Sequence, residues 1–284
     1  MYAIMGITGN VGGVAARALL NGGHAVRALV RDLSKAAEWA AEGVELVQGD
    51  FTDSVAIARV MRGADAAFLM LPPFMAPSPG FSEAQAIIAS YREALRQSSP
   101  QRLVVLSSIG SEQPSGLGMI TATHLLEQAL ANVTIPIAFV RAGSFFENYV
   151  PGYKGAVATG VFHSFWTPTD RAFPMIASVD IGREVARRMV DSWSGKKIVE
   201  LGSPVSPDAL ALAMSEVAGR PIEARAIPRE QWTGTLEAIG FSPRGIGPYT
   251  EMVDSCNSGW IGFGVPGSEA IAGATTPAQF FARV

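Results

Sequence analysis

The sequence predicts an α/β protein built on a doubly wound, mainly parallel sheet. Six short apolar runs recur along the chain with helical segments between them, and a seventh, at residues 1–5, leads into glycines at positions 6, 9 and 12. Apolar strands that alternate with helices are typical of a parallel sheet covered on both faces and joined by right-handed βαβ units. Apolar residues at helical spacing within residues 125–130 and 181–190 predict helices that pack on this sheet. The six runs span residues 25–30, 44–47, 66–71, 103–106, 137–140 and 198–201.

The amino-terminal segment has the pattern of a dinucleotide-binding loop, with a strand before the glycines and a helical run at residues 14–20 after them. Glycines at such places let the chain turn sharply, let backbone N–H groups approach a pyrophosphate, and let the helix pack closely on the strand. The spacing G-x-x-G-x-x-G matches the G-x-G-x-x-G fingerprint only in part, and a plain glycine-rich turn is the alternative. Because strand and helix flank the loop, we expect cofactor binding by Gly6, Thr8, Gly9, Asn10, Val11 and Gly12.

The end of the second strand decides which nicotinamide nucleotide fits. Arg31 and Asp32 follow the run at residues 25–30. A carboxylate at this place binds the ribose 2′-OH of NAD, whereas an arginine accommodates the 2′-phosphate of NADP. Neighbouring side chains of a strand point to opposite faces, so only one of the two is expected at the ribose. The position of Arg31 directly after the strand favours NADPH or NADP, with NADH as the second choice. The alternative is that Arg31 is a solvated loop charge and that the protein does not discriminate.

Two further strand ends supply cofactor candidates, because ligands of open α/β sheets bind outside the carboxyl ends of the strands. Asp50 and Phe51 follow the third strand, where an adenine edge is expected. Asp50 either accepts a hydrogen bond from the adenine amino group or begins a turn ahead of a helix cap at residues 52–53. Leu71 and Pro72 end the fourth strand and are expected to form the wall beneath the ribose.

Two polar residues follow on the fifth and sixth strands. Ser107 lies near the expected nicotinamide position, and its hydroxyl either bonds the cofactor or substrate or satisfies local backbone groups in a turn. Arg141 either anchors a phosphate or carboxamide or pairs with Glu147.

After about residue 145 the pattern changes to aromatic- and glycine-rich sequence. Tyr149, Phe165 and Trp166 are candidates for stacking a flat substrate, and core packing is the alternative.

The carboxyl-terminal part is expected to be a small, mostly helical lobe. Ser206 is a natural N-cap ahead of a proline, and Gly219 is placed to end that helix; Pro228 opens another helix, which Gly240 ends. Because a strand near residue 198 returns to the sheet after the aromatic segment, the two parts of the chain interleave. We expect a dinucleotide-binding domain at residues 1–145 that also receives residues 178–202, and a substrate-side lobe formed by residues 146–177 and 203–284.

Composition excludes several kinds of partner. The 284 residues carry a net charge of −3, and without a block of Lys or Arg a nucleic-acid surface is not expected. The longest apolar stretch, residues 66–77, is interrupted by prolines and too short to cross a bilayer, so no membrane segment is expected, and no targeting segment is visible. The single Cys256 rules out an internal disulfide, fits a reducing compartment and so indicates a cytoplasmic protein, with its own role left open. Neither His24 nor His163 has neighbours at metal-ligand spacing, so no metal is expected.

Several motifs together resemble the NmrA-like group of atypical short-chain dehydrogenases. They are the glycine loop at residues 6–12, the segments 29–32, 49–50 and 107–108, and the more specific segments 141–148 and 178–182. The resemblance covers nearly the whole chain, and the carboxyl-terminal lobe is similar to that of bacterial NAD(P)H quinone reductases and triphenylmethane-dye reductases of this group. It implies a Rossmann fold that binds NADP(H), with substrate held between the two lobes.

The sequence departs from the short-chain dehydrogenase pattern at the catalytic pair. Those enzymes generally use Tyr-x-x-x-Lys, but residues 109–127 contain neither a tyrosine nor a lysine, and Met119 and Thr123 fall at the corresponding places. Hydride addition to an unactivated ketone needs a positioned acid, which contributes about 10²- to 10⁴-fold. Alcohol or ketone chemistry is therefore not expected. His124 is the one candidate proton donor, and an ordinary helix-surface or packing histidine is the alternative.

The expected function is that of an NADPH-dependent reductase that transfers hydride directly to a quinone- or dye-like acceptor. Reduction of such an acceptor leaves a delocalised or cancelled charge, and a phenol-like product with a pKa of about 10 takes its proton from water. The alternative is a non-catalytic NADP(H)-binding redox sensor that contacts a protein partner, as some NmrA-like proteins do. A sugar-nucleotide epimerase or dehydratase is disfavoured, because these need the tyrosine that is absent here.

Overall fold

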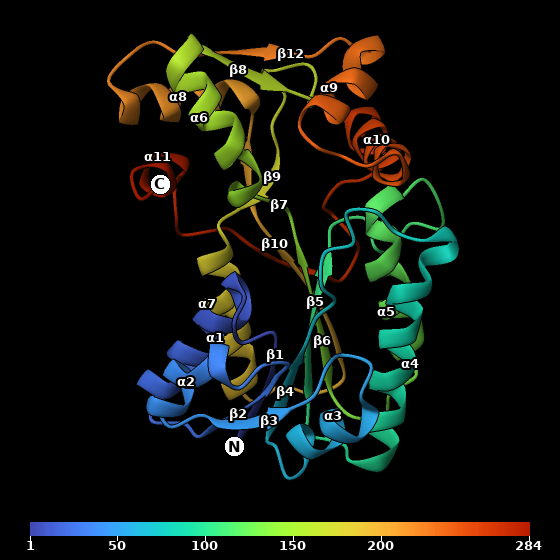
Figure 1. Ribbon diagram of the computed structural model, residues 1–284. Coiled ribbons are helices and arrows are strands. Elements are labelled where there is room, and N and C mark those ends of the chain that lie inside the picture. Colours follow the sequence, from blue (N-terminus) through green and yellow to red (C-terminus); the bar gives the residue numbers. More distant parts are fainter.

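The computed structural model describes all 284 residues and is centred on an eight-stranded sheet (Figure 1). Its strand order is β13-β10-β6-β5-β4-β1-β2-β3, and every neighbouring pair runs parallel. The doubly wound α/β fold expected from the sequence is confirmed. The strands are β1 (Tyr2–Met5), β2 (Val26–Val30), β3 (Glu45–Gln48), β4 (Ala66–Leu69), β5 (Leu103–Ser108), β6 (Ile137–Ala142), β10 (Lys196–Leu201) and β13 (Glu269–Ile271).

The direction of winding reverses between β1 and β4. The chain moves outward from β1 to β2 and β3 and then crosses back to place β4 on the other side of β1. Open α/β sheets bind their ligands outside the carboxyl ends of the strands at such a reversal. The glycine loop after β1 and the segment after β4 therefore meet at this point.

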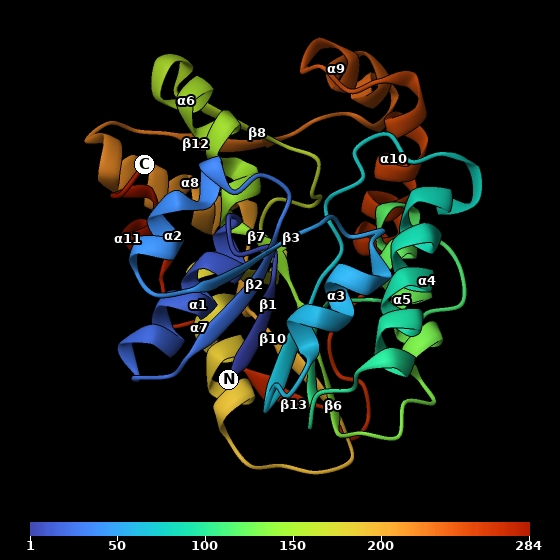
Figure 2. The same cartoon turned by 60° about the horizontal axis from the view of Figure 1, so that its bottom comes forward.

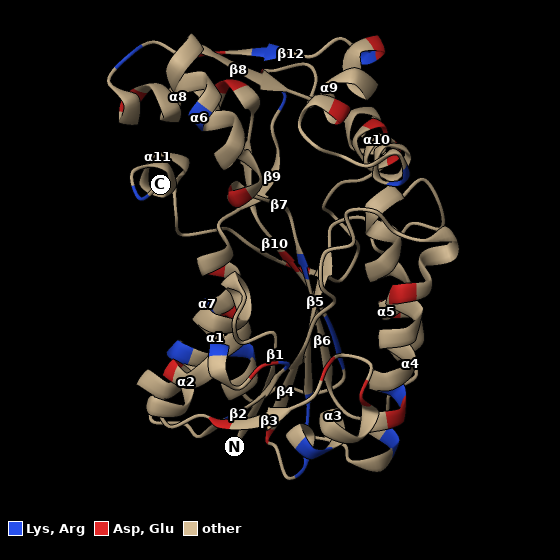
Figure 3. Ribbon diagram, in the orientation of Figure 1, with Lys and Arg blue, Asp and Glu red and all other residues tan.

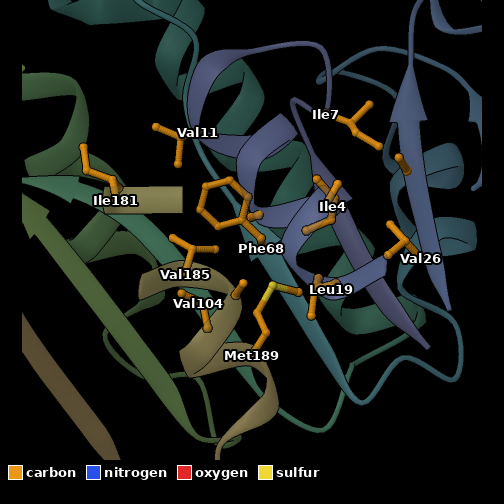
Figure 4. Close-up of a cluster of buried hydrophobic side chains, with 14 of the residues drawn as sticks. Ile4, Ile7, Val11, Leu19, Val26, Phe68, Val104, Ile181, Val185 and Met189 are labelled. Carbon is orange, nitrogen blue, oxygen red and sulfur yellow. The ribbon is translucent and has the colours of Figure 1, made fainter. Parts of the chain in front are cut away.

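Helices cover both faces of the sheet (Figures 1 and 2). Along β1, Ile4 belongs to one buried cluster while its neighbours Ala3 and Met5 belong to another, as the alternation of side chains along a strand requires. Figure 4 shows the first cluster, where Phe68 of the sheet meets side chains of two helices. One face carries α1 (Asn10–Asn21), α2 (Ala37–Ala41) and α7 (Ser178–Val190); the other carries α3 (Ser54–Met61), α4 (Ser82–Gln97) and α5 (Thr121–Leu130).

Helix α7 packs closely on the start of α1 at Gly182. A Cβ added there would lie 2.6 Å from the Cβ of Val14 and 2.8 Å from the carbonyl oxygen of Val11. Glycine therefore allows the two helices to approach, and it fixes the position of the helix that follows the glycine loop.

After β6 the chain forms a second group of elements, returns to the sheet through α7 and β10, and leaves it again. This group contains two small sheets, ordered β11-β9-β7 and β12-β8, which were not predicted from the sequence. Its strands are β7 (Ser144–Phe145), β8 (Val161–Ser164), β9 (Phe173–Ile176), β11 (Ser203–Val205) and β12 (Glu223–Ala226); its helices are α6 (Val150–Thr159), α8 (Pro207–Ala218), α9 (Trp232–Ala238), α10 (Pro243–Ser258) and α11 (Pro277–Phe281). Short 3₁₀ turns are η1 (Ser34–Ala36), η2 (Pro79–Phe81), η3 (Gly118–Ile120), η4 (Phe146–Tyr149) and η5 (Arg229–Gln231).

The predicted ends of α8 are confirmed. The Ser206 side chain accepts a hydrogen bond from the N–H of Ala209 at 3.1 Å, and Gly219 follows the helix with a φ of +64°. A Ser cap and a left-handed glycine satisfy the free backbone groups at the two ends of a helix.

The carboxyl-terminal segment is fixed to β10 and to α7 by two buried carboxylates. Glu200 accepts hydrogen bonds from the N–H groups of Gly264 and Val265, and Asp180 accepts one from Thr275 at 2.7 Å. Between these two anchors the chain forms β13, which pairs with β10 at the edge of the sheet. No helix is both long and apolar enough to span a bilayer.

Candidate functional site

The glycine loop turns back on itself directly after β1. Gly6 has a φ of +75°, and its carbonyl oxygen accepts a hydrogen bond from Gly9 at 3.0 Å. A Cβ added to Gly12 would lie 2.3 Å from that same oxygen. Only glycine fits position 12, because any side chain there would clash with the backbone of Gly6.

The loop leads into the free end of a helix. Gly9 is the N-cap of α1, no side chain caps the helix, and no acidic residue lies in its first turn. The first N–H groups of a helix lack partners within the helix, and together with the helix dipole they favour an anion. The residues present therefore fit the pyrophosphate of a dinucleotide.

The segment after β4 lies beside this loop. A Cβ added to Gly6 would meet the sulfur of Met70 at 2.7 Å, and the Met70 carbonyl accepts a hydrogen bond from the Tyr91 hydroxyl at 2.6 Å. Leu71 and Pro72 come next and are half-buried. Met70 therefore lies against the glycine loop, and the two residues expected beneath the ribose follow it directly in the chain.

A hollow of about 370 Å³ lies between the glycine loop and α2. Arg17, Lys35 and Trp39 contribute to its walls and were not singled out from the sequence. Gly13 and Arg17 lie one turn apart on α1 and face α2 across the hollow. Local sequence does not reveal this arrangement, because it depends on where α2 packs. The lining residues are Ile7, Thr8, Gly9, Asn10, Gly13, Val14, Arg17, Lys35, Glu38 and Trp39.

Arg31 and Asp32, although neighbours in the chain, have different surroundings. One carboxylate oxygen of Asp32 accepts hydrogen bonds from the N–H and hydroxyl groups of Ser34, at 2.9 and 2.6 Å, and these bonds lower the pKa of Asp32. Asp32 thus shapes the turn into η1. Arg31 is exposed, and no carboxylate lies within ion-pair distance of its guanidinium.

Asp50 begins a turn, which is one of the two roles that the sequence allowed for it. It accepts hydrogen bonds from the N–H and hydroxyl of Thr52, at 2.7 and 2.5 Å, and these bonds lower the pKa of Asp50. Asp53 then caps α3 by accepting from the N–H of Ala56 at 2.9 Å. Phe51, half-buried, packs edge-on against Tyr91.

Ser107 and Arg141 belong to a closed network in the interior. The Arg141 guanidinium forms a two-bonded pair with Glu127, at 2.9 and 2.7 Å, and a further bond of 2.7 Å with Glu112. Ser107 donates to the same Glu127 carboxylate at 2.5 Å. The pairing of Arg141 with Glu147, one of the two alternatives for this residue, is wrong, because Glu147 instead accepts from the N–H of Ser178 at the start of α7.

The three aromatic candidates lie within a buried cluster or pack directly against it. Tyr149 and Trp166 are each only 9% exposed; the Tyr149 hydroxyl bonds Ser144 at 2.9 Å, and the Trp166 ring stacks on Phe173 with centroids 4.5 Å apart. Phe165 meets Trp232 and Tyr249 edge-on. Their rings therefore contact other side chains, as expected for the alternative of core packing.

The places of the missing Tyr-Lys pair are occupied by Met119 and Thr123. Met119 lies in η3, and Thr123 donates to the carbonyl of Ile120 at 2.9 Å and shares a 2.8 Å hydrogen bond with Ser111. The Nδ1 atom of the half-buried His124 lies 2.9 Å from the carbonyl oxygen of Ser111, which leaves Nε2 as the unengaged ring nitrogen. No group of three or more His, Cys, Asp or Glu side chains is arranged to hold a metal ion.

The chain is similar in sequence or in structure to three known proteins. The (4-alkanoyl-5-oxo-2,5-dihydrofuran-3-yl)methyl phosphate reductase of Streptomyces griseus is 31% identical over 229 residues, which cover 78% of this chain and 75% of that one. Quinone oxidoreductase 2 of Escherichia coli is 23% identical over 87% of this chain and 84% of that one, and its complex with NADPH superposes with a TM-score of 0.82 at 22% identity, covering 100% and 99% of the two chains. The triphenylmethane reductase of Citrobacter sp., complexed with NADP(H), superposes with a TM-score of 0.79 at 18% identity, covering 99% of each chain.

The family is shown by the sequence itself. Residues 2–253, which include the whole glycine loop, the polar network of Arg141 and the start of α7, match the NmrA-like family. This protein therefore belongs to the NmrA-like family.

Proposed function

We propose that this protein is an NADPH-dependent reductase that passes hydride directly to a flat, conjugated acceptor of the quinone or dye kind. The bound nicotinamide supplies the hydride. Residues 1–145 with 178–202 bind the dinucleotide in this proposal, and residues 146–177 with 203–284 form the substrate side.

Three sets of residues hold the dinucleotide. The N–H groups of the loop at residues 6–12 and the start of α1 bind the pyrophosphate, because no side chain competes for them. Leu71 and Pro72 support the ribose beside the loop, while Arg31, Asp50 and Phe51 surround the adenosine end. Ser107 and Arg141, whose polar groups are taken up by Glu127 and Glu112, serve to fix the ends of β5 and β6.

The observation that carries the proposed reaction is the engagement of Thr123. Where short-chain dehydrogenases have a lysine, this hydroxyl bonds Ser111 and Ile120, and no tyrosine is nearby in the chain to act as an acid. Without a positioned acid, hydride transfer is favourable only when the acceptor spreads or cancels the charge it receives. The acceptors in the names of the similar proteins, a quinone, an oxo-dihydrofuran and a triphenylmethane dye, are all conjugated systems.

The test compares acceptors at a fixed NADPH concentration. We expect NADPH oxidation, followed at its nicotinamide absorbance, with a naphthoquinone and with a cationic triphenylmethane dye, and none above the blank with cyclohexanone. Thr123→Val, which removes only the hydroxyl, should keep the quinone rate within about twofold, because a group that is not the acid contributes none of the 10²- to 10⁴-fold effect of one. Turnover of cyclohexanone would contradict the proposal. Loss of quinone reduction in Thr123→Val would also contradict it.

Nucleotide binding separates this function from the alternative of a redox sensor. At 100 times its dissociation constant, a nucleotide that binds the folded state adds about 2.7 kcal/mol of stability, which a thermal-shift assay detects. Stabilisation by both NADPH and NADP⁺ without oxidation of NADPH by any acceptor would favour the sensor. Stabilisation by neither would exclude both functions.

A further inference from the structure

Tyr249 of α10 carries a phenol hydroxyl that no other group of the protein occupies. The ring is half-buried and packs edge-on against Phe165 and Phe241, whose centroids lie 5.5 and 4.9 Å away. The hydroxyl forms no hydrogen bond within the protein, and its oxygen is not sealed from solvent. A fixed ring with a free hydroxyl is therefore available to a ligand.

Resting on the proposed reduction of a conjugated acceptor, we propose that the Tyr249 hydroxyl donates a hydrogen bond to the carbonyl oxygen of a quinone-like acceptor and stabilises the negative charge that hydride transfer places on this oxygen. The role differs from that of the tyrosine in short-chain dehydrogenases, because Tyr249 comes from the substrate-side lobe and keeps its proton.

Two close backbone contacts hold α10 against segments that leave the ligand-binding edge of the sheet. A Cβ added to Gly245 would overlap the carbonyl oxygen of Met75, in the segment after β4. A Cβ added to Gly118, in the segment after β5, would overlap the carbonyl oxygen of Pro248. Ligands of open α/β sheets bind outside the carboxyl ends of the strands, which is where both segments begin. Tyr249 lies between the two contacts, one turn after Gly245 and next to Pro248.

The contact at Gly118 also brings α10 next to the place of the missing tyrosine. Met119 stands at that place, directly after Gly118. The residue that meets Gly118 is Pro248, and Tyr249 follows it in the helix. A phenol that is absent from the local sequence is thus supplied by a helix much later in the chain.

Other polar side chains in this part of the protein are already engaged. The Tyr149 hydroxyl bonds Ser144 at 2.9 Å, and Arg171 donates to the carbonyl of Asn257 at the end of α10. Burial, and in smaller part the nearness of Tyr249, raises the pKa of Tyr149. Strands β7, β8 and β9 carry no Lys, Arg, Asp or Glu (Figure 3). Among these groups, the Tyr249 hydroxyl is the donor that remains for an oxygen of the acceptor.

The Tyr249 hydroxyl keeps its proton at neutral pH, because burial raises the pKa of this residue to about 12. Such a group is poorly matched to general acid catalysis near neutral pH, but it donates a hydrogen bond over the whole physiological range. A hydroquinone anion, with a phenol-like pKa of about 10, does not take this proton and is protonated by water. Tyr249 therefore acts as a hydrogen-bond donor and not as an acid.

The electron balance of the transfer decides which acceptors need this donor. A quinone gains a hydride with its two electrons from the bound nicotinamide, which is oxidised, and an electron pair comes to rest on a carbonyl oxygen. A cationic triphenylmethane dye gains the same hydride at its central carbon, and its positive charge is cancelled without formation of an oxyanion. The hydrogen bond from Tyr249 therefore stabilises the product charge only for the quinone.

The test compares Tyr249→Phe with the unaltered protein, because this substitution removes the hydroxyl and keeps the ring. NADPH oxidation is measured with 1,4-naphthoquinone and with a cationic triphenylmethane dye that contains no oxygen. Binding of 1,4-naphthoquinone to the complex with NADP⁺, in which no hydride is transferred, is measured by quenching of tryptophan fluorescence. The matched control is Tyr2→Phe, since Tyr2 is half-buried at the amino end of β1, away from the site, and its hydroxyl also lacks a partner.

We expect Tyr249→Phe to lower kcat/KM for the quinone about 10- to 100-fold, as the loss of a hydrogen bond to a charged group does, and to leave kcat/KM for the dye within about twofold. Affinity for the quinone in the NADP⁺ complex should fall only about threefold, because its oxygen is then uncharged. Tyr2→Phe should leave all these values unchanged.

Equal losses with both acceptors would show that Tyr249 only packs the lobe, and an unchanged quinone rate would show that its hydroxyl does not reach the acceptor. Either result overturns the inference and leaves the proposed reaction standing. Reduction of the dye alone by the unaltered protein would also overturn the inference. If the unaltered protein reduces neither acceptor, the proposed function itself fails, and the role of Tyr249 fails with it.

Discussion

Gly12 lies against the backbone of Gly6, so closely that a Cβ on Gly12 would be 2.3 Å from the Gly6 carbonyl oxygen and 2.7 Å from its carbon. The contact joins the end of β1 to the first turn of α1. It closes the loop so that the free N–H groups of the helix point to the place where the winding of the sheet reverses. Because the atoms that a Cβ would meet belong to the backbone, no flexible side chain can move aside.

We therefore expect Gly12→Ala to abolish nucleotide binding and to lower the free energy of unfolding by about 1–3 kcal/mol, as overpacking does. The measurements are a thermal shift with NADPH and urea unfolding without it. Gly155→Ala is the matched control: it lies exposed in α6, an added Cβ meets nothing within 4 Å, and it should stabilise by about 0.5–1 kcal/mol. NADPH binding by Gly12→Ala with unchanged affinity would show that the loop is not the binding site.

Arg141 and Glu127 support the fold, because both are buried and joined by two short hydrogen bonds. Removing one partner of such a pair leaves an uncompensated charge and costs about 3–5 kcal/mol. Arg141→Met should therefore unfold at much lower urea concentration, and the double variant Arg141→Met with Glu127→Leu should recover part of the loss. A stable Arg141→Met protein that binds NADPH poorly would instead identify Arg141 as a nucleotide ligand.

The parts that the sequence predicted well depend on local pattern. The apolar run at residues 137–140 becomes β6 and the one at residues 44–47 becomes β3, each shifted or extended by no more than two residues, because a buried parallel strand needs only a short apolar stretch. The glycine loop and the Ser206 cap are likewise encoded by neighbouring residues.

The parts that escaped prediction depend on contacts between distant residues. The three-residue β13 is held in place by Glu200 through the backbone of Gly264, a contact that no local pattern reveals. The engagement of Arg141 by Glu127 and Glu112, instead of Glu147, depends on how α5 and the loop after β5 pack on β6. The burial of Tyr149 and Trp166 depends on helices that occur later in the chain.

Cys256 should be nearly inert toward thiol reagents in the folded protein. The residue is 3% exposed, and burial raises the pKa of its thiol to about 12, from 9.0. The thiolate fraction at pH 8 is then about 1,000-fold lower than for a free thiol, and only the thiolate reacts. Alkylation by iodoacetamide should be slow in buffer and complete, with one thiol per chain, in guanidinium.

The same shift in pKa predicts how stability depends on alkaline pH. Because the folded state holds the neutral thiol and the unfolded state ionises first, the stabilising contribution of this group is present below about pH 9 and is lost as the pH rises from 9 toward 12. Cys256→Ala, which has no ionisable group here, should lose less stability over that range. Rapid alkylation at pH 8 without denaturant would show that the thiol is accessible.

Gly182 links the packing of α7 to the nucleotide loop, because a Cβ there would meet both the Val14 side chain and the Val11 carbonyl oxygen. We expect Gly182→Ala to push the first turn of α1 out of place, to cost about 1–3 kcal/mol and to weaken NADPH binding along with stability. Adding Val14→Ala removes the Val14 Cγ1 atom at 2.8 Å but leaves its Cβ at 2.6 Å and the Val11 oxygen at 2.8 Å, so it should restore only a small part of the stability and of the affinity. Urea unfolding and NADPH titration of the two single variants and the double variant provide the double-mutant cycle. Strictly additive changes would contradict this contact, since residues that touch should show a coupling of about 0.5–3 kcal/mol.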